Sequence, residues 1–235
     1  VVALPPPVQV NDTAGFSIVT YTGGGSATTV GHGLGKVPSL IILKRRDSTN
    51  SWLVKHQNST SNKNLQLHTT NAELTTSDFT GGIIGDLSSS TVFSTVAGSS
   101  GVVNVSSSND FIAYCFTDIK GYSKFGSYTG NGNTDGAFVY TGFKPAFVLT
   151  KRTDSTNDWE IQDSARSDFN VCDEGLYPNL NSAEGDADRY DLLSNGIKMR
   201  TSGGMNQSGG TYIYIAFAEH PFVSLSLIHI SEPTR

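Results

Sequence analysis

Hydrophobic and polar residues alternate in short runs along most of this chain, which is the pattern of half-buried β-strands. Residues 16–21 (FSIVTY) alternate and end at a glycine-rich turn, and residues 28–30 form a second run. The apolar run 40–43 and the run 52–54 flank the polar residues 47–50, which are typical of a hairpin connection. Helix formers never gather into a stripe of helical period, so the pattern predicts an all-β fold.

The second half of the chain repeats this pattern. The runs 147–150 and 159–161 flank another polar cluster, and Asn195-Gly196, a dipeptide typical of tight hairpins, separates two more runs. Each half ends in a long run, residues 111–116 and residues 212–217. The last run predicts a strand with Ile213, Ile215 and Phe217 on one face and with Tyr212 and Tyr214 on the other.

Part of the sequence occurs twice. Residues 44–52 (KRRDSTNSW) return as residues 151–159 (KRTDSTNDW) at an offset of 107. About a hundred residues are enough for a domain with its own core. The repetition therefore predicts two tandem, jelly-roll-like β-sandwich repeats, residues 16–124 and residues 125–222. The connection between them is short, so we expect the repeats to pack directly against each other.

Both ends of the chain differ from the rest. Residues 1–15 open with a proline-rich stretch, which predicts a semi-rigid linker. Residues 223–235 form a tail, in which residues 225–235 (LSLIHISEPTR) resemble the translation of a transposase-type sequencing adapter, so they are left out of the fold argument. We expect native sequence to continue beyond both ends.

Composition argues against several classes of function. The formal net charge is −5 and no segment is strongly basic, so no nucleic-acid partner is expected. No apolar run reaches the roughly 18 residues that a membrane span needs, so no membrane insertion is expected. Cys115 falls in a predicted strand and should be buried, whereas Cys172 falls in a polar loop. Their places in the two halves are not equivalent, so we expect free thiols, which suit a reducing cytoplasm.

Several motifs carry a resemblance to a known family. They are YTGGG at residues 21–25, GHGLG at residues 31–35, GSYTGNG at residues 126–132, FVYTGFKPAF at residues 138–147 and DLLSNGIK at residues 191–198. With them, residues 16–222 resemble a repeated domain of tail and tail-fibre-like structural proteins of tailed bacteriophages, of a type abundant in marine viromes. The resemblance implies a virion component that is assembled in the host cytoplasm, contacts other tail proteins and host-surface polysaccharide, and forms a homo-oligomer in the particle. It supplies no catalytic residue and no cofactor.

Two tryptophans follow the repeated hairpin loops. An exposed Trp beside Asp and Asn is typical of a sugar-binding subsite, so Trp52 and Trp159 are candidate ligand contacts. The alternative is structural, because a motif present in both copies also serves what both folds need. On that interpretation, which we favour, both rings occupy equivalent, largely buried positions.

A second group of candidates lies where the copies differ. Residues 163–189 are predicted to form one long polar insertion. Its composition resembles that of a carbohydrate or cell-surface contact, and its candidate ligand-binding residues are Arg166, Tyr177, Asp186, Asp188 and Arg189. The alternative is a solvated loop that covers a sheet edge.

The sequence supports a catalytic or metal-binding function less well than a binding function. The carboxylates Asp47, Asp154, Asp163 and Glu160 could supply a glycosidase pair, but all lie in or beside hairpins where acids are common. His32, His56, His68 and His220 lack metal-ligand spacing and are predicted at the surface or in turns. The glycines of residues 31–35 predict a turn with positive φ. We therefore predict a non-enzymatic module without metal or cofactor, with a polysaccharide-degrading tail enzyme or a secreted bacterial adhesin as alternatives.

Overall fold

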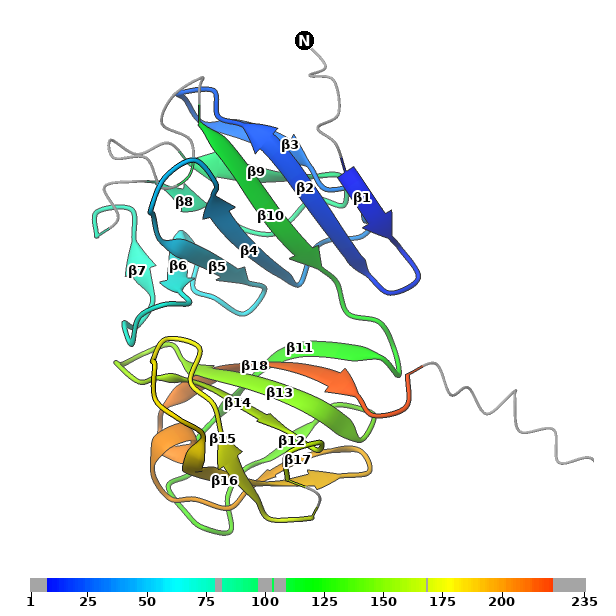
Figure 1. The fold of residues 1–235 in the computed structure, drawn as a ribbon, viewed down its shortest axis with the longest axis vertical. Coiled ribbons are helices and arrows are strands. Elements are labelled where there is room, and N and C mark those ends of the chain that lie inside the picture. Colours follow the sequence, from blue (N-terminus) through cyan, green and yellow to red (C-terminus); the bar gives the residue numbers. More distant parts are fainter. Residues whose placement is uncertain (1–7, 79–81, 97–102, 104–108, 168, 222–235) are drawn as a thin grey trace, which may run out of the picture.

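A computed structural model describes residues 8–78, 82–96, 103, 109–167 and 169–221 of the chain. They form eighteen β-strands and a single 3-10 turn, η1 (Gly204–Asn206), so the prediction of an all-β fold is confirmed. All strand pairs are antiparallel and belong to four sheets. In Figure 1 the first ten strands lie in the upper part of the molecule and the last eight in the lower part.

The first half contains a large sheet and a small one. The large sheet has the order β1 (Val8–Asn11), β2 (Phe16–Thr22), β10 (Asp110–Phe116), β4 (Leu40–Arg45), β5 (Trp52–His56), β6 (Lys63–Gln66) and β7 (Leu74–Thr75). The small sheet has the order β3 (Thr28–Gly31), β9 (Val92–Val96) and β8 (Ile83–Ile84).

The second half contains two four-stranded sheets. The inner one has the order β11 (Ser123–Thr129), β18 (Thr211–Ala218), β13 (Pro145–Arg152) and β14 (Trp159–Asp163). The outer one has the order β12 (Phe138–Tyr140), β17 (Gly196–Met199), β16 (Gly185–Leu193) and β15 (Cys172–Gly175). The inner sheet lies on the side of the first half and the outer sheet on the far side (Figure 1).

The two halves share a strand order. The order β2-β10-β4-β5 in the first half corresponds to β11-β18-β13-β14 in the second. Ring pairs match as well: Tyr21 stacks on Phe111 at 5.1 Å between centroids, and Tyr128 stacks on Tyr212 at 5.0 Å. Each pair joins directly opposite residues of neighbouring strands. The duplication itself stays a prediction, but the two halves use one arrangement of strands.

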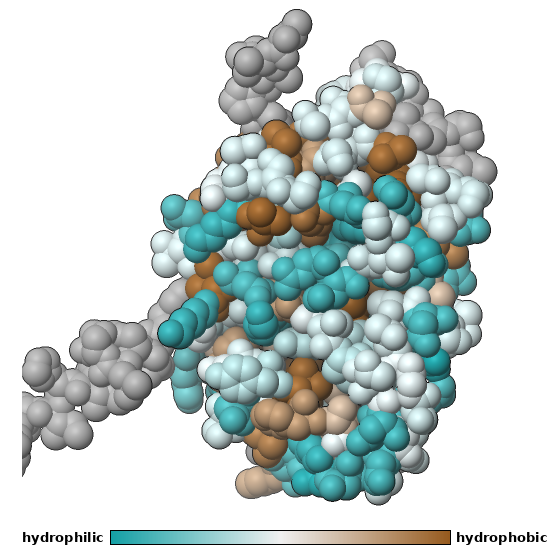
Figure 2. All heavy atoms as spheres, turned by 180° about the vertical axis from the view of Figure 1, so that it is seen from behind, coloured by the Kyte–Doolittle hydropathy of each residue, from teal (hydrophilic) through white to brown (hydrophobic). Residues whose placement is uncertain are grey.

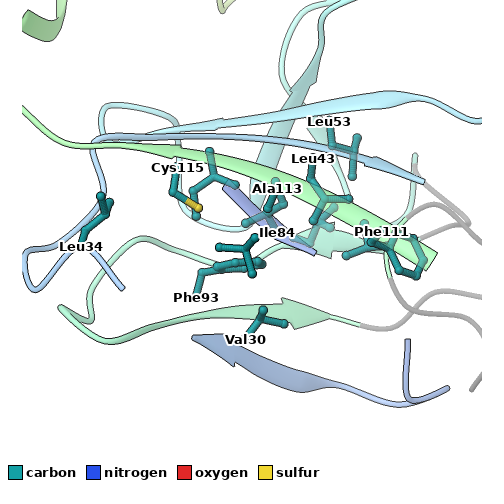
Figure 3. Packing of buried hydrophobic residues seen from close by; sticks show 13 residues of the cluster. Val30, Leu34, Leu43, Leu53, Ile84, Phe93, Phe111, Ala113 and Cys115 are labelled. Carbon is teal, nitrogen blue, oxygen red and sulfur yellow. The ribbon is translucent and has the colours of Figure 1, made fainter. Parts of the chain in front are cut away.

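Three apolar cores separate the four sheets. The first lies between the small and the large sheet, where Phe93 and Ile84 face Ala113 and Cys115 (Figure 3). The second lies between the two sheets of the second half and includes Tyr190 and Met199. The third, which we call the middle core, lies between the halves and is formed by Leu40, Val54, Leu65, Phe125, Leu149, Trp159, Ile213 and Ile215. The halves are therefore in direct contact, as expected.

Strand β18 belongs to an inner sheet and is buried on both faces. Its Ile213 and Ile215 enter the middle core, whereas Tyr212 and Tyr214 enter the second core. The predicted division of these side chains between two faces is thus confirmed. Both faces are buried, because sheets cover this strand on either side.

Two local predictions need correction. Residues 8–11 are strand β1, paired with β2, and not part of a linker, because their extended backbone extends the edge of the large sheet. In the β16–β17 hairpin, Leu193 pairs with Gly196, so Ser194 and Asn195 form the turn and not Asn195-Gly196. A glycine is needed at position 196 for a different reason. A Cβ there would lie 2.3 Å from the carbonyl oxygen of Val139. The proline-rich residues 1–7 and the tail from residue 222 lie outside the described residues.

Both cysteines are buried free thiols. Cys115 is buried as predicted, and burial raises its thiol pKa to about 12. Cys172 begins β15 and is 1 % exposed, so its placement in a polar loop was wrong; burial also raises its pKa.

We therefore expect neither native thiol to react with Ellman's reagent at pH 8, because a buried, protonated thiol is a poor nucleophile. Two thiols per chain should react after denaturation in guanidinium chloride. Prompt labelling of one thiol in the native protein would show that its strand opens.

Candidate functional site

The repeated KRxDSTNxW motifs form matching hairpins. Arg45 Nε lies 2.6 Å from Asp47, and Arg152 Nε lies 2.8 Å from Asp154. The hydrogen bond from Arg45 is the main cause that lowers the pKa of Asp47 to about 2, and the one from Arg152 lowers the pKa of Asp154. A glycosidase acid needs a raised pKa, so these environments suit a loop held by charge pairs better than proton donation.

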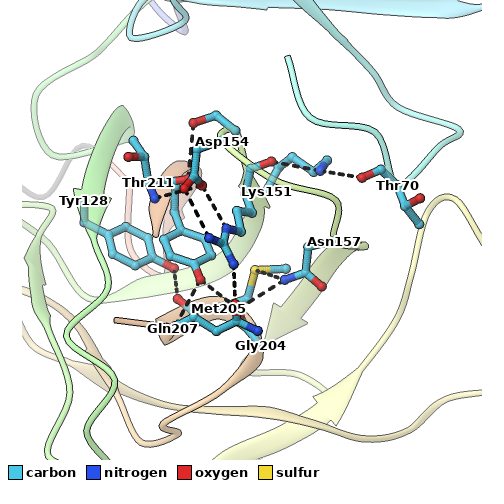
Figure 4. Close-up of polar contacts among 12 residues, drawn as sticks. Thr70, Tyr128, Lys151, Asp154, Asn157, Gly204, Met205, Gln207 and Thr211 are labelled. Atoms are coloured by element: carbon cyan, nitrogen blue, oxygen red, sulfur yellow. Dashed lines mark hydrogen bonds and ion pairs between the residues drawn. The ribbon is translucent and has the colours of Figure 1, made fainter. Parts of the chain in front are cut away.

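In the second half these groups belong to a larger polar cluster (Figure 4). Asp154 also accepts a hydrogen bond from the backbone N–H of Thr211 at 3.1 Å, and Arg152 donates to Gln207. The hydroxyl of Tyr212 donates to the carbonyl of Gly204 at 2.8 Å and accepts from the backbone N–H of Gln207 at 3.0 Å. These bonds fasten the hairpin to η1 and to the start of β18.

Lys151 connects the same cluster to the first half. Its side chain is fully buried, and its Nζ donates to the carbonyls of Arg152 at 2.8 Å and Thr70 at 3.2 Å. Burial lowers its pKa to about 8. Since Thr70 belongs to the first half, this lysine bridges the two halves (Figure 4).

The two tryptophans differ in exposure. Trp159 is 1 % exposed in the middle core, and its indole N–H donates to the carbonyl of Gln66 in the first half at 2.9 Å. Trp52 is only half-buried, and Lys44 Nζ lies 5.8 Å from its ring centroid. The two rings occupy equivalent positions, as predicted, since Trp52 lies directly opposite Lys44 and Trp159 directly opposite Lys151. The predicted burial is confirmed for Trp159, whereas Trp52 is less completely buried. Trp159 is closed to a ligand.

The predicted insertion is not one long loop. Residues 163–189 contain strand β15 and the start of β16, because this segment extends the outer sheet. Arg166 is half-buried and paired with Asp163 at 2.7 Å and with Glu184 at 3.0 Å. Tyr177 is half-buried after β15. Asp186, Asp188 and Arg189 lie on β16, and their side chains are outside the described part of the structure.

These candidates do not form one site with the tryptophans. Arg166 follows the end of β14 and its guanidinium donates a hydrogen bond to the carbonyl of Ile161 at 3.2 Å, whereas the ring of Trp159 is buried in the middle core and offers no surface beside it. Of the remaining carboxylates, Asp163 pairs with Arg166, and Glu160 is 3 % exposed and accepts a hydrogen bond from Gln162 at 2.9 Å.

One histidine was predicted wrongly, and a second is more buried than expected. His56 is the last residue of β5 and is fully buried, so it is neither at the surface nor in a turn. His32 lies in the glycine-rich turn, as predicted, but is fully buried there. His68 and His220 are exposed, as predicted. Among the described residues, no three His, Cys, Asp or Glu side chains lie close enough together to hold a metal ion. The glycine-rich turn is confirmed, since Gly33 and Gly35 have φ of 73° and 66°.

The structure also reveals a surface that the sequence did not single out. Phe138 and Tyr140 on β12 are 47 % and 65 % exposed, while Val139 between them is buried. The signal was present in the alternation of residues 138–140, but aromatic residues at such positions usually predict a core. Only the sheet order, which makes β12 an edge strand of an outer layer, places both rings outside.

No helix in the described part of the chain is long and apolar enough to cross a membrane. Searches of the curated proteins and of the solved structures give no match to the chain. One protein family matches residues 3–221, which is nearly the whole length. The chain therefore belongs to the family described as Domain of unknown function (DUF7483).

Proposed function

We propose that this chain is a non-catalytic structural module of the tail or tail fibre of a tailed bacteriophage, located in the virion, which contacts polysaccharide on the host surface. The observation that carries the proposal is the continuous stack of four antiparallel sheets with three apolar cores. Such a stack suits a stiff element that holds other parts at fixed positions. The resemblance of residues 16–222 to repeated domains of phage tail proteins supports the same role.

The polar chemistry of the motifs agrees with this proposal. In each of the two repeated hairpins an arginine and an aspartate form an ion pair within the chain. On the face drawn in Figure 2, hydrophobic residues form small separate patches among hydrophilic ones. A broad apolar surface would favour a large protein interface there. Contacts on this face are therefore proposed to be polar, as in binding to a hydrated glycan.

Mass spectrometry of purified phage particles tests the proposal. In particles of a phage whose genome encodes this chain, peptides from residues 16–221 should be found in the tail fraction after heads and tails are separated. A non-structural phage protein serves as the negative control. Absence of these peptides from particles that contain the other tail proteins would contradict the virion role.

A further inference from the structure

A row of side chains crosses the outer face of the second half. Phe138 lies directly opposite Lys198 on β17, and Lys198 lies directly opposite Asp191 on β16. Directly opposite residues share a face of the sheet. The neighbouring positions Val139, Ile197 and Leu192 point the other way, into the second core. Phe138, Lys198 and Asp191, with Tyr140 two residues along β12, therefore share the outward face.

A glycine lies next to each of the two aromatic rings. A Cβ on Gly196 would lie 2.9 Å from the ring of Phe138, so this ring rests against the bare backbone of β17. A Cβ on Gly142 would lie 3.5 Å from the hydroxyl of Tyr140. The backbone N–H groups of Thr141 and Gly142 both donate to the carbonyl of Asn195, at 3.1 and 3.2 Å. These hydrogen bonds hold the end of β12 against the turn between β16 and β17.

Charged groups beside the rings are paired with one another. Lys198 Nζ lies 2.8 Å from Asp135 and donates to the carbonyl of Gly136 at 2.7 Å. Arg200 Nε lies 2.6 Å from Asp191. Two cations thus face two anions, and the patch offers hydrogen-bonding groups without an excess of either charge. This balance suits a neutral ligand rich in hydroxyl groups.

The corresponding strand pair in the first half has no exposed aromatic residues. In its small sheet, Val30 is buried opposite Phe93, as Val139 is buried opposite Ile197 in the outer sheet of the second half. The flanking pairs are Thr29 with Ser94 and Gly31 with Val92, where the second half has Phe138 with Lys198 and Tyr140 with Gly196. The same arrangement of strands thus tolerates small residues where the second half exposes two rings.

We propose that the outward face of β12 and β17 binds a neutral polysaccharide chain. Phe138 and Tyr140, about 7 Å apart along the strand, stack against the C–H faces of neighbouring pyranose rings. Lys198, Asp135 and Arg200 exchange hydrogen bonds with the sugar hydroxyls. The inference deepens the host-contacting part of the proposed function by naming the ligand class and its place.

Affinity electrophoresis of the full chain tests this site. Native gels containing hydroxyethylcellulose or laminarin, two neutral glucans, are compared with gels containing alginate, an anionic polysaccharide. We expect at least one neutral glucan to retard the chain. Phe138→Ala and Tyr140→Ala should each weaken that retardation about tenfold, since a lost stacking contact is worth about 1.4 kcal/mol.

Matched variants separate binding from folding. Phe169→Ala removes another exposed ring of the second half, 84 % exposed, and should leave retardation unchanged. Tyr140→Phe keeps the ring and should retain most of the binding. All four variants should melt within a few degrees of the parent chain, because these side chains are exposed.

The inference is overturned if neither neutral glucan retards the chain, if alginate alone does, or if the double variant Phe138→Ala/Tyr140→Ala is retarded as strongly as the parent. Such a result leaves the virion role intact, since that role is tested by particle composition. Conversely, absence from particles together with ring-dependent retardation would retain the glycan site and reject the virion role.

Discussion

Replacing Trp159 by Ala should lower the free energy of unfolding by about 3–5 kcal/mol, the range for a large buried aromatic side chain. The ring fills the middle core between the two halves, so its loss opens a cavity at their contact. The change also removes the hydrogen bond from the indole N–H to the carbonyl of Gln66, which would be left without this donor. Urea unfolding followed by circular dichroism measures the effect.

The matched control is Trp52→Ala, at the corresponding place of the first hairpin. Trp52 is half-buried and packs beside Lys44, so its removal should cost about 1 kcal/mol. Equal losses for the two variants would mean that exposure does not distinguish the rings in solution. That outcome would contradict the packing of Trp159 between the halves.

The second large effect concerns pH. His56 is fully buried in the large sheet, and burial lowers its pKa to about 3, against a smaller opposing contribution from the backbone of Tyr214 in the other half. Its Nδ1 accepts the backbone N–H of Asn58 at 3.1 Å, so Nε2 carries the hydrogen of the neutral ring.

The direction of the pH dependence of stability follows from the difference between the folded and unfolded chains in proton binding at His56. The unfolded chain takes up a proton at His56 near pH 6.5, whereas the folded chain resists it down to about pH 3. The contribution of neutral His56 to stability is therefore fully present above pH 6.5 and is lost progressively as the pH falls toward 3. Between pH 7 and pH 5 the free energy of unfolding should fall by about 2 kcal/mol from this residue.

Urea unfolding of the parent chain and of His56→Gln at both pH values isolates this contribution. The variant should show a smaller difference between pH 7 and pH 5, whatever its absolute stability. Carboxylates such as Asp47 and Asp86, whose pKa values are lowered to about 2, titrate below this window. An identical pH difference in both proteins would show that His56 is accessible to protons in the folded state.

The strands could be predicted from the sequence, because alternation and turn residues are local properties. The hairpin loop before Trp52 and the two faces of residues 212–217 could be predicted without knowledge of other segments. Whether one or both faces of a strand are buried depends on how the sheets stack, and no local sequence pattern shows this. This stacking determines how far individual side chains are exposed. It accounts for the different exposure of Trp52 and Trp159, the burial of His56 and the exposure of Tyr140.

The candidate site was predicted less well for the same reason. The composition of residues 163–189 indicated polar residues and led to one long loop, but β15 and β16 are held by pairing with each other and with the rest of the outer sheet. Cross-strand neighbours such as Phe138 and Lys198 are 60 positions apart in the sequence. Only the register of β12 against β17 brings them together.

The middle core has a consequence for how the chain carries mechanical load. Two domains joined by a flexible connection bend at that connection when a lateral force acts on them. Here bending would have to pull Phe125 and Ile215 away from Leu40 and Val54 and expose their surfaces to water, so the pair should resist it. Separating the halves would expose that face to water, so a shortened version of the chain should keep both halves together.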